Sequence, residues 1–213
     1  GTKFTMLFMI RELTIALILL MAVSVQAQET EAQTILFFGD SITAGLGVQQ
    51  EQAFPALVQD RIDSLGMNYE VINGGLSGET SAGGLRRIDW ILRRDIDLMV
   101  LELGGNDGLR GIDLSSTKEN LQKIIEKFQA KNPNGQIILA GMQVPPNLGQ
   151  EYTSEFQTIY PELAEENDLP LIPLIMDKLG GSEELIQGDG IHPTPKGHKV
   201  IAETVWDVLK EYI

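Results

Sequence analysis

The sequence predicts an α/β protein, built as a three-layer α/β/α sandwich around a central five-stranded parallel sheet. Five short runs of residues are continuously apolar, which is typical of strands covered by helices on both faces. These runs alternate with helical patterns across short connections, and such alternation favours parallel strands. The 213 residues contain no repeat, low-complexity tract or linker, so we expect one domain with a full-sized core.

The expected strands, in chain order, are residues 34–38 (TILFF), 69–72 (YEVI), 97–103 (DLMVLEL), 136–141 (QIILAG) and 171–174 (LIPL). The expected helices are residues 54–65, 84–94, 116–130, 153–167 and 194–212. In the third of these helices, four apolar residues recur at the spacing that places them on one face: Leu121, Ile124, Ile125 and Phe128. An Asn-Gly pair and an Asn-Asp pair signal turns before the fourth and fifth strands.

The composition excludes several classes of function. Lys and Arg number 16 against 30 Asp and Glu, a net charge of −14, and a nucleic-acid partner would require a basic face instead. With two His and no Cys, the chain has no disulfide, no thiolate zinc site and no cysteine nucleophile. Neither His has a second His or Cys placed to complete a metal site, so we expect no metal.

The N-terminal segment has the pattern of an export signal. Lys3 and Arg11 precede an apolar run over residues 13–25, and Val-Gln-Ala follows with small residues where a signal peptidase cleaves. An apolar run of this length is short for a membrane span, which needs about 20 residues. We therefore interpret residues 1–27 as a signal peptide and residues 28–213 as a mature periplasmic or secreted domain. The alternative is an uncleaved N-terminal anchor.

Polar, glycine-bearing loops follow the first three expected strands. Their sequences are Gly-Asp-Ser at 39–41, Asn-Gly-Gly at 73–75 and Gly-Gly-Asn-Asp at 104–107. Because parallel strands end at the same edge of a sheet, where such proteins bind ligands, these loops are expected to converge. The loop at 188–193, before the last helix, can reach the same edge.

Ser41 is the candidate nucleophile, because it directly follows a buried strand at a sharp turn. A serine at such a place is more often a helix N-cap. The surrounding Gly-Asp-Ser-Ile-Thr differs from the G-x-S-x-G elbow, which disfavours the α/β-hydrolase family proper. A serine needs a base, and His192 lies in a loop with Asp189 three residues earlier to orient it. His198, in the last helix, is expected to be a solvated helix residue.

Three donors could stabilise an oxyanion at this edge: the backbone N–H groups of Ser41 and Gly75 and the side-chain amide of Asn106. Glycines beside these donors would allow close approach, although tight turns alone would also explain them. We expect Asp40 and Asp107, which flank the key residues, to hold the loops by accepting backbone N–H groups.

Four separated blocks resemble the SGNH (GDSL) hydrolase superfamily: Gly39–Thr43 (GDSIT), Asn73–Gly78 (NGGLSG), Gly104–Asp107 (GGND) and Asp189–Pro193 (DGIHP). Their order and intervals also match. Residues 108–111, 145–149 and 152–153 are similar to the branch of bacterial multifunctional esterases, which includes thioesterases, lysophospholipases and periplasmic arylesterases. The resemblance implies Ser41 as nucleophile, His192 as base, Asp189 as its orienting acid, and Ser41, Gly75 and Asn106 as the oxyanion hole. It also implies a flavodoxin-like sheet ordered 2-1-3-4-5 and no cofactor.

The expected function is that of a serine esterase hydrolysing small-molecule acyl esters or thioesters through an acyl-enzyme. We expect neither a nucleic-acid nor a metal partner, and a monomer or weak oligomer. Apolar residues near the site either line an acyl groove or pack under loops: Leu76, Leu109, Ile112, Val144, Pro145 and Pro146. Two alternatives are a carbohydrate O-acetylesterase on the same fold and a catalytically silent lipid or glycan binder.

Overall fold

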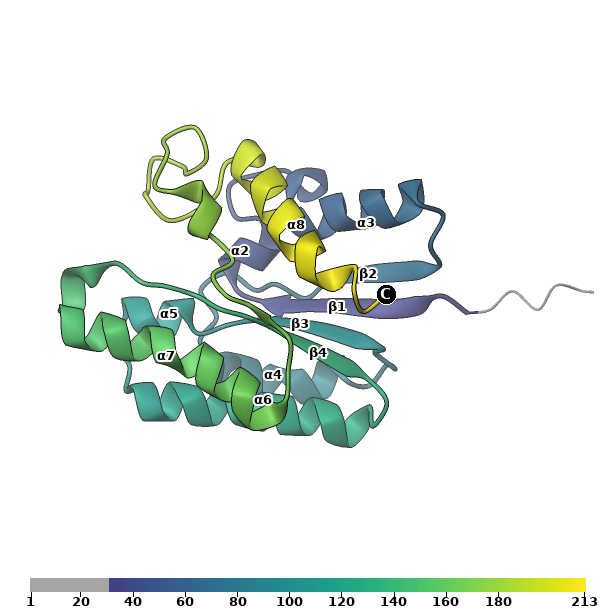
Figure 1. The fold of residues 1–213 in the computed structure, drawn as a ribbon, viewed down its shortest axis with the longest axis horizontal. Helices are drawn as coiled ribbons and strands as arrows, with labels where there is room; N and C mark the ends of the chain where they lie inside the picture. Colours follow the sequence, from purple (N-terminus) through teal and green to yellow (C-terminus); the bar gives the residue numbers. More distant parts are fainter. Residues whose placement is uncertain (1–30) are drawn as a thin grey trace, which may run out of the picture. The chain divides into compact units, whose positions relative to one another are not determined.

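A computed structural model describes residues 31–213 (Figure 1). The proposed signal peptide, residues 1–27, lies outside the described residues, as do the first three residues of the expected mature domain. No helix within residues 31–213 is both long enough and apolar enough to cross a membrane.

The described chain forms the expected five-stranded parallel sheet, with helices on both faces. The strands are β1 (Gln33–Gly39), β2 (Tyr69–Asn73), β3 (Leu98–Glu102), β4 (Gln136–Ala140) and β5 (Leu171–Ile172). Their order in the sheet is β2-β1-β3-β4-β5, and every neighbouring pair is parallel. This order confirms the flavodoxin-like topology that the resemblance implies.

The α-helices are α2 (Ser41–Ala44), α3 (Phe54–Ser64), α4 (Ser81–Ile91), α5 (Gly105–Leu109), α6 (Leu114–Lys131), α7 (Gln150–Asn167) and α8 (Pro195–Leu209). Short 3₁₀ turns occupy Gln50–Gln52, Pro146–Leu148 and Asp177–Leu179. Helices α3 and α8 cover one face of the sheet, and α4, α6 and α7 cover the other (Figure 1). The three layers of the prediction are therefore confirmed.

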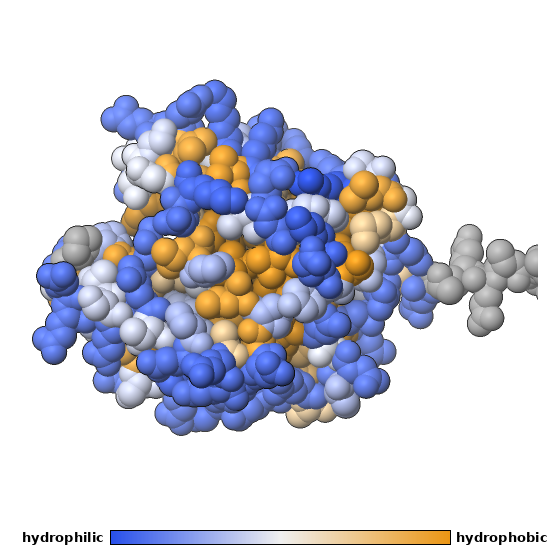
Figure 2. Space-filling model, viewed as in Figure 1, coloured by the Kyte–Doolittle hydropathy of each residue, from blue (hydrophilic) through white to orange (hydrophobic). Residues whose placement is uncertain are grey.

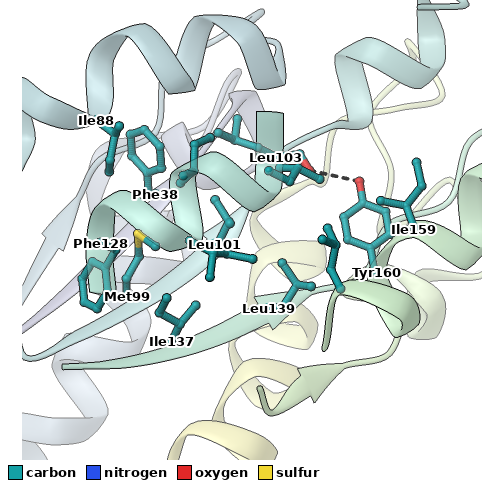
Figure 3. Close-up of a cluster of buried hydrophobic side chains, with 14 of the residues drawn as sticks. Phe38, Ile88, Met99, Leu101, Leu103, Phe128, Ile137, Leu139, Ile159 and Tyr160 are labelled. Atoms are coloured by element: carbon teal, nitrogen blue, oxygen red, sulfur yellow. Dashed lines mark hydrogen bonds between the residues drawn. The ribbon is translucent and has the colours of Figure 1, made fainter. Parts of the chain in front are cut away.

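The sheet separates two hydrophobic cores. Along β3, Met99 and Leu101 join the core beneath α4, α6 and α7, whereas Leu98 and Val100 join the core beneath α3 and α8. Figure 3 shows the first of these cores, in which Met99, Leu101 and Leu139 of neighbouring strands lie among side chains of the covering helices. Figure 2 shows hydrophobic residues between the two helical layers and mainly hydrophilic ones around them.

Three local expectations are wrong. Strand β2 is half-exposed rather than covered on both faces, because it lies at the edge of the sheet. Strand β5 ends at Ile172, two residues early, and the next residue, Pro173, has no N–H to donate to a neighbouring strand. Helix α4 begins at Ser81, three residues early, because the Thr80 side chain accepts a hydrogen bond from the Gly83 N–H and caps it.

Candidate active site

Strand β1 leads directly into the turn that carries Ser41. Asp40 is the N-cap of α2, and its Oδ1 accepts a hydrogen bond from the Ile42 N–H at 3.0 Å. The capping role that a serine could have had therefore belongs to Asp40, and the Ser41 hydroxyl is left to face His192. Helix α2 ends after one turn at Gly45, which has a positive φ of 77°.

Ser41, His192 and Asp189 form a continuous hydrogen-bonded chain. The Ser41 Oγ lies 2.9 Å from the His192 Nε2, and the His192 Nδ1 lies 2.6 Å from the Asp189 Oδ2. The other carboxylate oxygen, Oδ1, accepts the backbone N–H groups of Ile191 at 2.9 Å and His192 at 3.0 Å. The backbone N–H of His192, followed by its ring, lowers the pKa of Asp189 to about 2. Asp189 is therefore a carboxylate at neutral pH and holds the imidazole by Nδ1.

The two other candidates for the oxyanion hole are Gly75 and Asn106. Both lie near Ser41, and both are hydrogen-bonded within the protein. The Gly75 N–H donates to the Asn73 Oδ1 at 3.0 Å. The Asn106 side-chain amide donates to the Asp40 Oδ2 and to the Glu79 carbonyl, each at 3.1 Å. A Cβ at Gly75 would overlap the backbone N of Ala44 in α2, so this loop packs tightly against the helix of Ser41.

The two aspartates that flank the site anchor its loops, as expected. Asp107 accepts the Ser81 N–H at 2.8 Å and the Ser81 hydroxyl at 2.5 Å, which joins α5 to the start of α4. Asp40 receives the Ile42 N–H and also the amide of Asn106. Burial raises the pKa of Asp40 to about 6, against the opposing effects of the Ile42 N–H and of His192.

The expectation that His198 is solvated is wrong. Its side chain is wholly buried, and its Nδ1 accepts the Phe54 N–H at 3.2 Å, at the start of α3. Its ring also stacks on that of Phe54, with centroids 6.3 Å apart. Burial lowers the pKa of His198 to about 4, so the ring is neutral at pH 7. Only one imidazole, that of His192, is therefore placed to face Ser41.

Sequence reasoning missed two polar side chains that support the site. Glu102 is wholly buried at the end of β3, and its Oε2 accepts the Thr43 hydroxyl at 2.6 Å. The Gln187 Nε2 donates to the carbonyls of Leu46 and Pro193, both at 2.8 Å, and so joins the loop after α2 to the loop of His192. An acid within the apolar residues 98–103 was a signal for Glu102, whereas nothing distinguished Gln187 from other loop glutamines.

A cavity of about 660 Å³ opens beside Ser41 and His192. Apolar side chains from the ends of β4 and β5 and from α5 line it, including Leu109, Met142, Val144, Leu174 and Ile175. Leu109, Val144 and Pro145 are thus the members of the predicted acyl groove that reach the cavity, whereas Leu76 and Ile112 do not line it. Residues 31–213 contain no cluster of three or more His, Cys, Asp or Glu able to hold a metal ion.

At the carboxyl edge of the sheet, a serine, an imidazole and a carboxylate are hydrogen-bonded in this order. This arrangement on a three-layer α/β fold is the architecture of a serine hydrolase. Residues 37–200 match the model of the GDSL-like Lipase/Acylhydrolase family. The chain belongs to this family.

Relatives with esterase names cover most of the chain. It is 39% identical to the esterase TesA of Pseudomonas aeruginosa over 89% of the chain and 94% of that protein. It is 35% identical to an arylesterase of Vibrio mimicus, over 96% of the chain and all of that protein. Among solved structures, the psychrotrophic esterase EstA from Pseudoalteromonas sp., inhibited by monoethylphosphonate, superposes with a TM-score of 0.80 at 34% identity, covering 84% of this chain and 98% of that one.

These relatives confirm the class of enzyme that the four sequence blocks predict. The chain is a carboxylic-ester hydrolase of the GDSL/SGNH type, and it acts on small-molecule esters.

Proposed function

We propose that the chain hydrolyses acyl esters and thioesters in two steps, with Ser41 as nucleophile, His192 as general base and acid, and Asp189 as the residue that orients His192. The observation that carries this proposal is the hydrogen-bonded chain from the Ser41 Oγ through both ring nitrogens of His192 to the Asp189 carboxylate. The low pKa of Asp189 supports it, because an ionised carboxylate keeps a proton on Nδ1 and leaves the lone pair of Nε2 facing Ser41.

In the first step, the His192 Nε2 takes the proton of the Ser41 hydroxyl while the oxygen attacks the substrate carbonyl carbon. The bond from that carbon to the alcohol or thiol then breaks, and the protonated imidazole gives its proton to the leaving group. In the second step, water loses a proton to the same Nε2 and attacks the acyl-enzyme, which releases the acid and restores the Ser41 hydroxyl. An imidazole acts as a base only when neutral, so the rate declines at acid pH.

The oxyanion hole that we propose uses the N–H groups of Ser41 and Gly75 and the amide of Asn106. In the structure Gly75 and Asn106 donate to groups of the protein, so these donors exchange an internal acceptor for the oxyanion that develops on the substrate. Such preorganised donors are each typically worth about 10²–10³ in turnover.

The apolar cavity supports an acyl chain as the part of the substrate that the enzyme encloses. Its walls carry aliphatic and methionine side chains, which favour a hydrocarbon over a sugar. The names of the relatives indicate ester hydrolysis, and we extend the proposal to thioesters and lysophospholipids because the same acyl transfer serves all three.

The substitution Ser41→Ala tests the nucleophile. We expect turnover of a p-nitrophenyl ester to fall on the order of 10⁴-fold or more, and covalent labelling by a fluorophosphonate to disappear. Ser154→Ala, an exposed position on α7, is the control and should retain both. Full turnover or labelling in Ser41→Ala would disprove the proposal, and a wild-type protein that is not labelled would favour the silent binder.

We also propose that residues 1–27 direct export and that residues 28–213 act in the periplasm or outside the cell. The support is the basic start, the apolar run and the Val-Gln-Ala site before Gln28. Sequencing the N-terminus of the exported protein tests this, since a start other than residue 28 would favour the uncleaved anchor.

A further inference from the structure

A wholly buried carboxyl group lies directly beneath the catalytic turn. Glu102 is the last residue of β3, the central strand, and it pairs in register with Gly39 of β1. Among the described residues, no Lys, Arg or His forms an ion pair with it. Burying an acid without a cation is costly, so a hydrophobic residue would be expected here from stability alone.

The hydrogen bonds of Glu102 go to Asp40 and Thr43, which lie on either side of Ser41. Its Oε2 accepts the Thr43 hydroxyl at 2.6 Å and the Asp40 N–H at 3.3 Å. Its other oxygen, Oε1, has no hydrogen-bond partner among the described residues. One carboxyl oxygen of Glu102 therefore binds both sides of the turn that contains Ser41.

Gly39 leaves the space that this carboxyl group fills. A Cβ at residue 39 would overlap the Oε2 of Glu102 and the hydroxyl of Thr43. The glycine that opens the Gly-Asp-Ser block is therefore required for the contact between Glu102 and the turn.

The surroundings of Glu102 disfavour its charged form. Burial, and then the proximity of Asp40, raise the pKa of Glu102 well above its ordinary value. A charged carboxylate here would add a negative charge beneath the oxyanion that forms on the substrate, whereas a neutral one holds the turn without opposing the reaction.

We propose that Glu102 is a positioning residue, whose Oε2 fixes Asp40 and Thr43 so that the Ser41 hydroxyl stays within reach of the His192 Nε2. This role rests on the proposed function of Ser41 and His192. Glu102 does not touch the substrate and donates no proton to it. It acts through the geometry of the turn.

Three variants test this role by steady-state kinetics on a p-nitrophenyl ester. Glu102→Met keeps the length of the side chain but removes the acceptor, and we expect kcat to fall about 10–100-fold with little change in KM, because small misplacements of reacting groups have such effects. Glu102→Gln keeps a neutral carbonyl acceptor and should retain kcat within about threefold. Thr43→Val removes one donor and should have an intermediate kcat.

A double variant separates positioning from general damage. If Glu102 acts through the Thr43 hydroxyl, Glu102→Met and Thr43→Val together should reduce kcat by less than the product of their separate effects. Asn132→Leu is the matched control, because Asn132 is a buried polar residue that binds the Ile96 N–H near the start of β3, at the opposite edge of the sheet. It should lower the melting temperature and leave kcat unchanged.

The pH dependence of kcat tests whether Glu102 acts without a charge. Glu102→Gln should keep the acid limb of the wild-type profile, because glutamine is uncharged and burial disfavours the charged form of Glu102. If the acid limb of Glu102→Gln moves to lower pH and its kcat also falls, the proposal is overturned, because Glu102 would then act through its charge on His192. Wild-type kcat in Glu102→Met would also overturn it. If Glu102→Met does not fold, wild-type kcat in Thr43→Val would have the same consequence.

These outcomes are distinguishable from failure of the proposed function itself. If Ser41→Ala were active, the nucleophile would be wrong whatever Glu102 does. If Ser41→Ala is inactive and Glu102→Met has wild-type kcat, only the positioning role is lost.

Discussion

The imidazole of His198 lies inside the protein at the start of α3, where it accepts the N–H of Phe54. That N–H belongs to the first turn of a helix and has no partner within the helix. An imidazole accepts a hydrogen bond only at a ring nitrogen without a proton, so the interaction needs neutral His198. The pKa of about 4 agrees with this requirement.

The substitution His198→Asn tests this interaction through stability. In the folded protein the pKa of His198 is about 4, below the 6.5 of a free histidine, so its contribution to stability is complete above pH 6.5 and is lost as the pH falls towards 4. The Oδ1 of asparagine can replace Nδ1 as acceptor without titrating. Urea unfolding at pH 7 and pH 5 should therefore show a pH-dependent loss smaller by about 1–2 kcal/mol in the variant.

An equal loss in the two proteins would contradict this reading of His198. Other ionisable groups do not confuse the comparison, because they are common to both proteins and cancel in the difference.

Helix α7 is joined to the end of β3 through the buried hydroxyl of Tyr160. The Tyr160 hydroxyl donates to the Leu103 carbonyl at 3.0 Å, just before the loop of Asn106 (Figure 3). Gly104 lies against this hydroxyl, since a Cβ there would come within 2.5 Å of it, and its φ of 112° also favours glycine. The Gly104–Asp107 block is thus shaped by Tyr160, which lies more than fifty residues further along the chain.

Tyr160→Phe should lower the free energy of unfolding by about 1–2 kcal/mol, because the Leu103 carbonyl would remain buried without its donor. Chemical denaturation measures this change. Tyr212→Phe is the control, since Tyr212 is exposed near the C-terminus and should change stability by less than about 0.5 kcal/mol. Equal stability of Tyr160→Phe and wild type would show that the hydroxyl contributes nothing there.

The elements also show where local sequence patterns are sufficient. Apolar runs located all five strands, and the periodicity of 116–130 located α6, because these patterns report which side chains must be covered. The start of α4 was missed because Ser-Ala-Gly-Gly is a weak helix former. It is helical because Thr80 caps it and Asp107, on another element, holds Ser81.

The parallel sheet brings loops that are distant in the sequence to one edge of the domain. The cavity beside Ser41 is surrounded by five segments. Four of them follow β1, β3, β4 and β5, and the fifth is the loop before α8. No single segment encloses this space. Its size is therefore a property of the packed domain.

A series of p-nitrophenyl esters from acetate to dodecanoate tests what the cavity holds. Because its walls are apolar and its volume is about 660 Å³, we expect kcat/KM to rise from acetate to a medium chain as each buried methylene adds up to about 0.8 kcal/mol. Val144→Trp should shift the preference to shorter chains by filling the cavity. A maximum at acetate would instead favour the carbohydrate O-acetylesterase.

Sequence patterns were enough to predict the layered fold, the strand positions and the grouping of Ser41, Asn106, Asp189 and His192 at one edge. Apolar runs and glycine-bearing loops are local consequences of what each segment must bury or expose. The packing of the folded domain was needed to show that Asp40 rather than Ser41 caps α2, that His198 is buried, and that Glu102 lies beneath the turn. These outcomes depend on which side chains from remote elements share a buried space, and burial sets both their charge and their hydrogen bonds.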